Sequence, residues 1–274
     1  MIHLQREDLL HPFISGNKLR KLKHPLLDAV EKGCSTLVTF GGAFSNHLLA
    51  TACAGAEKGF KTVGIVRGER PEPINDVLFL CEMFGMELRF ISRDDYRRKP
   101  EYFENNFNAA THYFIDEGGR GELAVKGVEE AVAAWQKADH IILGVGTGAT
   151  LAGVIRGVNA LNLKTKVHGI SMIKGFTEIE SEISDLLPYN CSAQWEVHHD
   201  FHRGGYAKMD QDLITYIKSY AAKKGIILDP VYMGKVLMAA EKMIDDHIIP
   251  PNDSVLVIHT GGWTGILGAK SKFL

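Results

Sequence analysis

Short apolar segments alternate with longer amphipathic segments along this chain of 274 residues. Seven short segments are rich in Val, Ile and Leu and show little alternation of apolar and polar residues, which is typical of parallel strands buried on both faces. They are Thr36–Phe40, Thr62–Val66, Glu87–Ile91, His112–Ile115, Ile141–Val145, Lys166–Ser171 and Ser254–His259.

The amphipathic segments between them predict helices. A glycine follows several of these segments, as expected where a left-handed residue closes the last turn. The predicted helices are Lys18–Lys32, Asn46–Lys58, Ile74–Phe84, Glu122–Lys137, Ala149–Leu161, Asp210–Lys224 and Tyr232–Asp246. The repeated order of strand and helix predicts an α/β fold with doubly wound parallel sheets, and two such domains fit better than one sheet of seven or more strands.

Composition narrows the function only by exclusion. The formal net charge of −2 gives no reason to expect a nucleic-acid or anionic-membrane surface, and no apolar run is long enough to span a bilayer. The first residues lack the basic and apolar regions of a secretory signal. The four cysteines form no CxxC pair, so we expect reduced thiols in a cytoplasmic protein.

The first candidate for chemistry is the block Ser15-Gly16-Asn17-Lys18-Leu19-Arg20-Lys21-Leu22. Four cationic side chains fall within six residues, at Lys18, Arg20, Lys21 and Lys23. They fit a solvated basic helix face. They also fit a site in which one lysine, its pKa lowered by its neighbours, is a nucleophile and the others bind an anion.

Two further motifs lie where a predicted strand gives way to a helix, the edge at which open α/β sheets bind ligands. In Gly41-Gly42-Ala43-Phe44-Ser45-Asn46-His47, Ser45 and Asn46 fit helix caps as well as ligand-binding groups. The loop from Gly144 to Thr150 presents backbone N–H groups at a helix N-terminus, which favours an anion. Position 149 is Ala and no acidic residue stands about 20 residues on, so one phosphate fits this loop better than a dinucleotide.

Histidines close to one another raise the question of a metal. His198, His199 and His202 have no cysteine nearby, and their intervals do not match a helical pair of zinc ligands. We expect a polar loop there and no metal site.

Taken together, the motifs resemble the family of pyridoxal-phosphate (PLP) enzymes that includes 1-aminocyclopropane-1-carboxylate deaminase and D-cysteine desulfhydrase. The resemblance covers most of the chain in matching order. It rests on His3–Asp8, Gly16–Leu22, Gly41–His47, Gly146–Thr150, Leu228–Gly234 and His259–Gly262. It implies the tryptophan-synthase-β-like fold (fold type II), with a large domain of residues 1–22 and 120–274 and a smaller inserted α/β domain of residues 23–119. It also implies a homodimer acting on a small amino acid.

The resemblance carries roles to individual positions. Lys18 would hold the cofactor as a Schiff base, and Lys21 would lie near its phosphate. Asn46 would bond the 3′ oxygen, and Thr260 would pair with the pyridine nitrogen. The substrate side would have Ser45, Tyr206 and Tyr232, and the phosphate would be held by the backbone of Gly146, Thr147, Gly148, Ala149 and Thr150.

One departure bears on the substrate. The deaminase has a glutamate directly after the tyrosine of its Asp-Pro-Val-Tyr motif, where this chain has Met233. A thioether cannot take up a proton there, so we expect β-elimination of the desulfhydrase type rather than cyclopropane opening. Three alternatives stay open: 1-aminocyclopropane-1-carboxylate deaminase itself, a PLP- or phosphate-binding protein of the same fold with little catalysis, and a nucleotide-binding module unrelated to PLP.

Overall fold

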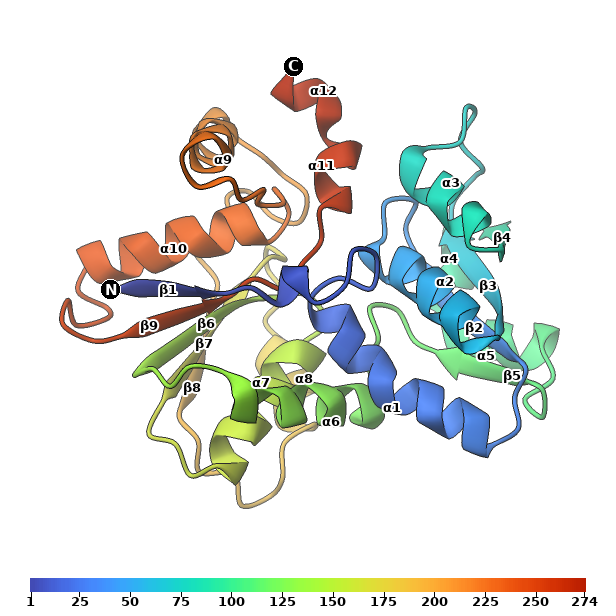
Figure 1. Ribbon diagram of the computed structural model, residues 1–274, viewed down its shortest axis with the longest axis horizontal. Helices are drawn as coiled ribbons and strands as arrows, with labels where there is room; N and C mark the ends of the chain where they lie inside the picture. Colours follow the sequence, from blue (N-terminus) through green and yellow to red (C-terminus); the bar gives the residue numbers. More distant parts are fainter.

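The computed structural model describes residues 1–274 and contains two parallel β-sheets side by side (Figure 1). The larger sheet has the strand order β1-β9-β6-β7-β8 and the smaller one β4-β3-β2-β5. The strands of the larger sheet are β1 (Ile2–Gln5), β6 (His140–Val145), β7 (Lys166–Ser171), β8 (Trp195–His198) and β9 (Val255–Ile258). Those of the smaller sheet are β2 (Thr36–Gly41), β3 (Lys61–Arg67), β4 (Met86–Ile91) and β5 (His112–Ile115). The predicted α/β class with two parallel sheets is confirmed.

Helices cover both faces of each sheet, as a doubly wound fold requires. The first half of the chain contains α1 (Asn17–Glu31), α2 (Asn46–Lys58), α3 (Asp76–Met83), α4 (Arg93–Arg97) and α5 (Lys99–Asn106). The second half contains α6 (Glu122–Ala131), α7 (Ala149–Ala160), α8 (Ile179–Ser184), α9 (Gln211–Lys224), α10 (Met233–Asp245), α11 (Thr264–Gly268) and α12 (Lys270–Phe273). Two 3₁₀ turns, Glu7–Leu9 and Val132–Ala134, complete the elements. None of the helices combines the length and the apolarity that crossing a bilayer needs.

Successive side chains of a strand point to opposite faces of the larger sheet, so its core has two parts. Ile141 and Leu143 of β6 pack with α6, α7 and α8, whereas Ile142 packs with α9 and α10 on the other face. The smaller sheet is divided in the same way: Leu37 packs with α1 and α2, and Phe40 packs with Tyr96 and Phe103 from α4 and α5. This two-sided burial explains the continuous apolar runs in the sequence.

Helix α1 joins the two halves of the molecule. Leu22 and Ala29 pack into the core of the smaller sheet, while the backbone at Arg20 lies against Gly127 of α6. Helices α1 and α6 accordingly lie side by side (Figure 1). The chain supplies β1 to the larger sheet, then the whole smaller sheet, then returns for β6 to β9. This order supports the division into 1–22 with 120–274 and 23–119, which we retain as a proposal.

Two features of the structure differ from the sequence predictions. Two edge strands, β1 and β8, were missed because each is four residues long and alternates apolar with polar residues. The predicted helix 122–137 ends early: after α6 and a 3₁₀ turn, Trp135 turns away and its indole N–H donates to buried Glu7 at 2.8 Å. The segment from Tyr96 to Ala110, for which the sequence leaves a surface loop and a short helix open, contains the whole of helix α5, with Pro100 in its first turn.

Candidate active site

A cavity opens between the carboxyl end of β6 and the start of α1, and it is lined mostly by polar residues and glycines. Convergent polar groups in one concave place are typical of sites for small molecules and cofactors. Nine predicted site residues line it: Lys18, Lys21, Asn46, Gly146, Thr147, Gly148, Thr150, Tyr232 and Thr260. Segments far apart in the sequence therefore meet in one place, whereas Ser45, Ala149 and Tyr206 do not line the cavity.

Lys18 reaches the cavity because the chain before it makes a tight turn against the loop after β9. Gly16 has a positive φ of 62°, and a Cβ there would overlap the carbonyl oxygen of Thr260. The amide N–H of Asn17 donates to that same oxygen at 3.2 Å. A residue with a side chain cannot approach so closely, so Gly16 is what brings Lys18 beside Thr260.

The amine of Lys18 is chemically prepared for nucleophilic attack. Burial in the cavity lowers the pKa of Lys18 to about 8, although the charge of Asp229 opposes this. The amine donates a hydrogen bond to Asn17 Oδ1 at 2.9 Å, and Asn17 Nδ2 donates to Thr150 Oγ1 at 2.8 Å. A free lysine is almost entirely protonated at neutral pH, whereas this one supplies a useful fraction of neutral amine.

Lys21 lies near the loop that follows β6. It is buried, and burial together with the charge of Lys18 holds its pKa well below the ordinary value. Its amine donates to the carbonyl oxygen of Gly118 at 2.9 Å, and Gly118 lies against Thr147. A cationic or hydrogen-bonding group at this point suits an anion bound by the loop.

The loop from Gly146 to Thr150 leads directly into α7, a helix of 12 residues. The first N–H groups of a helix have no partner within the helix, and its dipole favours negative charge there. Gly148 has a φ of 78°, and a Cβ would meet Ile183 at 3.0 Å. Ala149 is fully buried and does not line the cavity, so only its backbone can take part.

Replacing Gly148 with aspartate should weaken binding of a phosphorylated cofactor at least about tenfold more than replacing it with asparagine. Both side chains meet Ile183 and both tolerate positive φ, so the pair differs mainly by one negative charge in the loop. Titration of the folded variants with the cofactor, followed by absorbance, measures the difference. Equal affinities for the two variants would remove this loop from the phosphate site.

Ser45 and Asn46 begin α2, and the structure shows the capping role of the first. Ser45 Oγ accepts the N–H groups of His47 at 3.2 Å and Leu48 at 3.3 Å. Ser45 does not line the cavity, whereas Asn46 does, and Asn46 Oδ1 accepts the hydroxyl of Thr264. The cap uses only the oxygen of Ser45 as an acceptor, so the hydroxyl proton can still be donated to a substrate. The catalytic role of Ser45 stays a prediction.

Glycine and alanine at position 45 separate the two roles. Ser45→Ala should lower the free energy of unfolding by about 1 kcal/mol and Ser45→Gly by only a few tenths. If the hydroxyl acts on the substrate, both variants should lose kcat/KM to the same extent, at least about tenfold. Thermal unfolding and steady-state kinetics on the same samples make the comparison. Activity that follows stability across the two variants would leave Ser45 as a cap alone.

The tyrosines stand on the other wall. Tyr206 and Tyr232 pack edge to face with ring centroids 6.0 Å apart, and Tyr232 lines the cavity while Tyr206 is 54% exposed. Desolvation raises the pKa of the Tyr232 hydroxyl well above its ordinary value. Tyr206 therefore lies nearer the protein surface than Tyr232 and does not line the cavity that contains Lys18.

Neither Asp229 nor Lys235 was predicted as a site residue, although both lie in or beside the motif Leu228–Gly234. Asp229 caps α10, accepting the N–H groups of Val231 and Tyr232 at 2.9 Å and of Met233 at 3.0 Å, and burial raises its pKa to about 6. Lys235 is 1% exposed and donates to the carbonyl oxygens of His202 and Gly205, which fastens the segment before Tyr206. Only the contacts made in the fold identify these supporting residues.

Other residues of the cavity wall were also missed. Gly118 follows β5 in the run Asp116-Glu117-Gly118-Gly119, a polar and glycine-rich turn at a strand end like those that were recognised. The remaining wall residues outside the predicted set are Ser15, Asn17, Gly144, Val145, Leu151 and Gly261. Asn17, Val145, Leu151 and Gly261 each directly adjoin a predicted site residue, and Ser15 and Gly144 lie within three residues of one.

The donor set fits pyridoxal phosphate. An amine of lowered pKa suits its aldehyde, a helix N-terminus with a second lysine suits its phosphate, and a hydroxyl at Thr260 suits its ring nitrogen. Such a site at the edge between two parallel-sheet halves defines a PLP enzyme. In agreement, the model of the family described as "Pyridoxal-phosphate dependent enzyme" matches residues 2–261, and the chain belongs to this family.

Individual relatives show which enzymes of this family the chain is similar to. The chain is 31% identical to a putative 1-aminocyclopropane-1-carboxylate deaminase of Thermotoga maritima, over 100% of this chain and 92% of the relative. It is 29% identical to the bifunctional D-cysteine desulfhydrase/1-aminocyclopropane-1-carboxylate deaminase of Arabidopsis thaliana, a mitochondrial protein, over 96% of this chain and 72% of the relative. The crystal structure of an ACC deaminase homologue superposes with a TM-score of 0.88 at 26% identity, covering 99% of this chain and 87% of that one. The expected family and fold are confirmed.

Proposed function

We propose that this chain is a PLP-dependent lyase that releases a keto acid and ammonia from a small amino acid carrying a leaving group at Cβ, with D-cysteine as the preferred substrate. The observation that carries the proposal concerns Thr260, which lines the same cavity as Lys18 and whose hydroxyl contacts the buried, apolar Met233. The names of the relatives support both this activity and the cyclopropane deaminase alternative.

Lys18 is the proposed base. When bound, pyridoxal phosphate withdraws electrons from the Cα of an amino acid joined to it and so makes the Cα–H acidic. The Lys18 amine would take up that proton at Nζ. Its pKa of about 8 in the unliganded cavity is close to the value that suits a base at neutral pH.

Thr260 favours elimination over chemistry that needs a stronger electron sink. The Thr260 hydroxyl donates to Met233 Sδ at 3.8 Å, and Met233 is fully buried. Neither Thr260 nor Met233 therefore supplies a negative charge to the ring nitrogen of the cofactor. A neutral hydroxyl does not hold a ring nitrogen protonated as a carboxylate would. Loss of a group already present at Cβ requires less charge storage than transamination does.

The tyrosines serve the leaving group in this proposal. Tyr232 keeps its proton at neutral pH because desolvation raises its pKa, so its hydroxyl can donate to a departing thiolate. Tyr206, packed against it, closes the outer side of the pocket. For D-cysteine the balance is one water consumed, with pyruvate, hydrogen sulfide and ammonia formed.

A screen of small D- and L-amino acids for keto-acid release tests the proposal. We expect pyruvate and sulfide in equal amounts from D-cysteine and weaker or no release from L-cysteine. A holoenzyme with a normal cofactor spectrum that releases no keto acid from any of them would overturn the lyase assignment. The alternative of a PLP-binding protein with little catalysis would then be preferred.

We also propose that the protein is a cytoplasmic homodimer that acts without nucleic-acid or membrane partners. All four cysteines are free, and three of them are buried. This agrees with a reducing compartment. The net charge of −2 supports neither a nucleic acid nor an anionic membrane as a partner.

A further inference from the structure

Two clusters outside the active site bring metal-ligating side chains together. One consists of His168, Glu196 and His198 on the larger sheet, and the other of His11, in the segment before α1, with Cys53 and Glu57 of α2. In each, the ligand atoms lie within 4.8 Å of one another. Hydrogen bonding and protonation decide which of them suits a metal.

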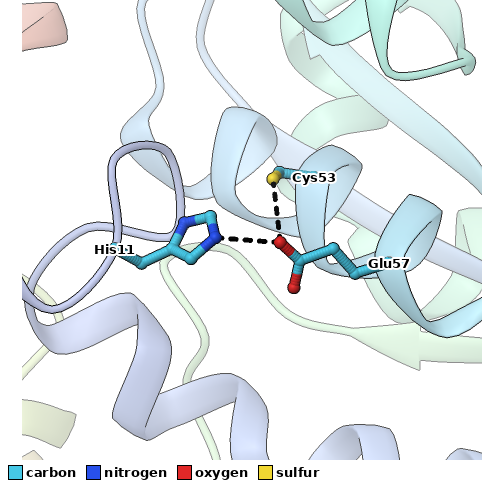
Figure 2. Close-up of side chains that lie close together, drawn as sticks. All are labelled: His11, Cys53 and Glu57. Atoms are coloured by element: carbon cyan, nitrogen blue, oxygen red, sulfur yellow. Dashed lines mark hydrogen bonds and ion pairs between the residues drawn. The ribbon is translucent and has the colours of Figure 1, made fainter.

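The His11 cluster is unsuited to a metal, although its side chains point toward one another (Figure 2). His11 Nδ1 accepts the backbone N–H groups of Phe13 at 3.2 Å and Ile14 at 2.9 Å, so the ring proton is on Nε2 and points at Glu57, 2.8 Å away. A metal at Nε2 would require loss of that proton. Burial and the charge of Glu57 raise the pKa of Cys53 to about 11, so its thiol stays protonated.

The second cluster is built by the register of the sheet. His168 of β7 stands directly opposite Glu196 of β8, and His198 is two residues further along β8. All three side chains therefore project from one face, since side chains two residues apart on a strand share a face. His168 Nδ1 and His198 Nε2 are 2.9 Å apart. Two nitrogens on one zinc ion lie roughly 3.3 Å apart, so the rings need to separate by only a few tenths of an ångström.

A chain of hydrogen bonds fixes the tautomer of His168. Asp253 Oδ2 lies 3.0 Å from His140 Nε2, which donates to it, so His140 Nδ1 carries a lone pair. That lone pair accepts the Nε2 proton of His168 at 2.9 Å. His168 Nδ1 is therefore a lone pair aimed at His198. Metal-binding histidines in proteins are commonly oriented by a hydrogen bond from the ring nitrogen that does not bind the metal. Here His140, itself bonded to Asp253, provides that hydrogen bond for His168.

Only one proton has to move for a metal to bind. Without a metal, His198 Nε2 donates its proton to His168 Nδ1. If that proton moves to His198 Nδ1, both facing nitrogens present lone pairs and no charge changes. Desolvation lowers the pKa of His168 to about 3 and also lowers that of His198, while Lys166 lowers the pKa of Glu196. The neutral imidazoles and the carboxylate are the forms that bind metals.

We propose that His168 Nδ1, His198 Nε2 and the carboxylate of Glu196 form a structural site for a divalent transition metal such as Zn²⁺. Solvent supplies the remaining ligand, because Glu196 is exposed. The metal would join β8, the edge strand, to β7. The sequence alone did not suggest this site because His168 lies 30 residues before His198, on a different strand.

Lys166 opposes the metal. Its amine lies 2.7 Å from Glu196 Oε2, and a cation there competes with a dication for the same carboxylate. The other carboxylate oxygen remains available. Removing this positive charge should therefore tighten binding, an effect that a purely structural role of the three ligands does not predict.

Zinc titration of the holoenzyme by calorimetry, with bound metal counted after dialysis, tests the site. We expect one Zn²⁺ per chain, at least about tenfold weaker binding in His198→Gln and in Glu196→Gln, and tighter binding in Lys166→Gln. His11→Gln is the matched control and should bind like the wild type. Zinc should raise the Tm of the wild type and not that of His198→Gln.

Glu196 is exposed and His198 is only partly buried, and an unchanged cofactor spectrum checks that the variants fold. Co²⁺ gives a second readout, since its visible bands depend on the nitrogen ligands. No bound zinc in the wild type, binding unchanged in His198→Gln, or loss of binding in His11→Gln would each overturn the proposal.

Discussion

Lys18→Ala is expected to abolish covalent attachment of the cofactor and to lower activity at least about 10³-fold. Lys18 is the lysine beside Thr260 in the cavity, and its pKa of about 8 keeps part of the amine neutral. Borohydride reduction followed by peptide mapping shows where the cofactor is fixed. The cofactor's visible imine band should be present in the wild type and missing in the variant.

Lys21→Ala and Lys23→Ala are the controls. Lys21 lies by the phosphate loop, so its loss should weaken cofactor binding without moving the attachment point. Lys23 is exposed and paired with Glu130 at 2.6 Å, so its loss should change neither. Cofactor fixed to either of these residues in the wild type, with Lys18 unmodified, would show that the wrong lysine was assigned.

The pKa of Lys18 gives the same assignment a pH dependence. Only the neutral amine attacks an aldehyde, and the group is neutral above its pKa. The rate at which apoenzyme takes up the cofactor should therefore rise with pH and level off above about pH 8. A rate still rising steeply toward pH 10 would indicate a lysine of ordinary pKa.

The sequence predicted well those features that depend on local pattern. Strands such as Lys166–Ser171 were found to the residue because burial on both faces produces an unbroken apolar run. The polar motifs at strand ends converged on one cavity because parallel strands bring their carboxyl ends to one edge. The expected cofactor and family are confirmed by the family match.

What the sequence did not predict depends on contacts between distant segments. Gly16 looks like an ordinary turn residue until Thr260 is placed against it. Asp229 and Lys235 resemble a helix start, and their support of the two tyrosines is visible only in the fold. The chain of hydrogen bonds from Asp253 to His198 joins four residues from separate segments of the sequence. The spacing of histidines within residues 198–202 could therefore not indicate it. The roles of individual site residues stay predictions.

The substrate prediction with the largest expected effect compares D-cysteine with 1-aminocyclopropane-1-carboxylate. We expect pyruvate from D-cysteine and ketobutyrate from the cyclopropane at a rate at least roughly 100-fold lower. The cyclopropane has no Cα–H, so Lys18 cannot begin by removing one. Ring opening needs another group to attack or deprotonate the ring, with polar support beside it.

Met233 is why that support is missing. It follows Tyr232 in the sequence, is fully buried in the core under α10, and offers Thr260 only a thioether sulfur. A sulfur cannot hold a proton or stabilise a cation as the glutamate of the resembled deaminase would. Both products should be measured with one batch of holoenzyme, and Lys18→Ala should form neither. Fast ketobutyrate formation by the wild type would show that Tyr232 opens the ring without a neighbouring carboxylate, and the deaminase alternative would replace the desulfhydrase-like proposal.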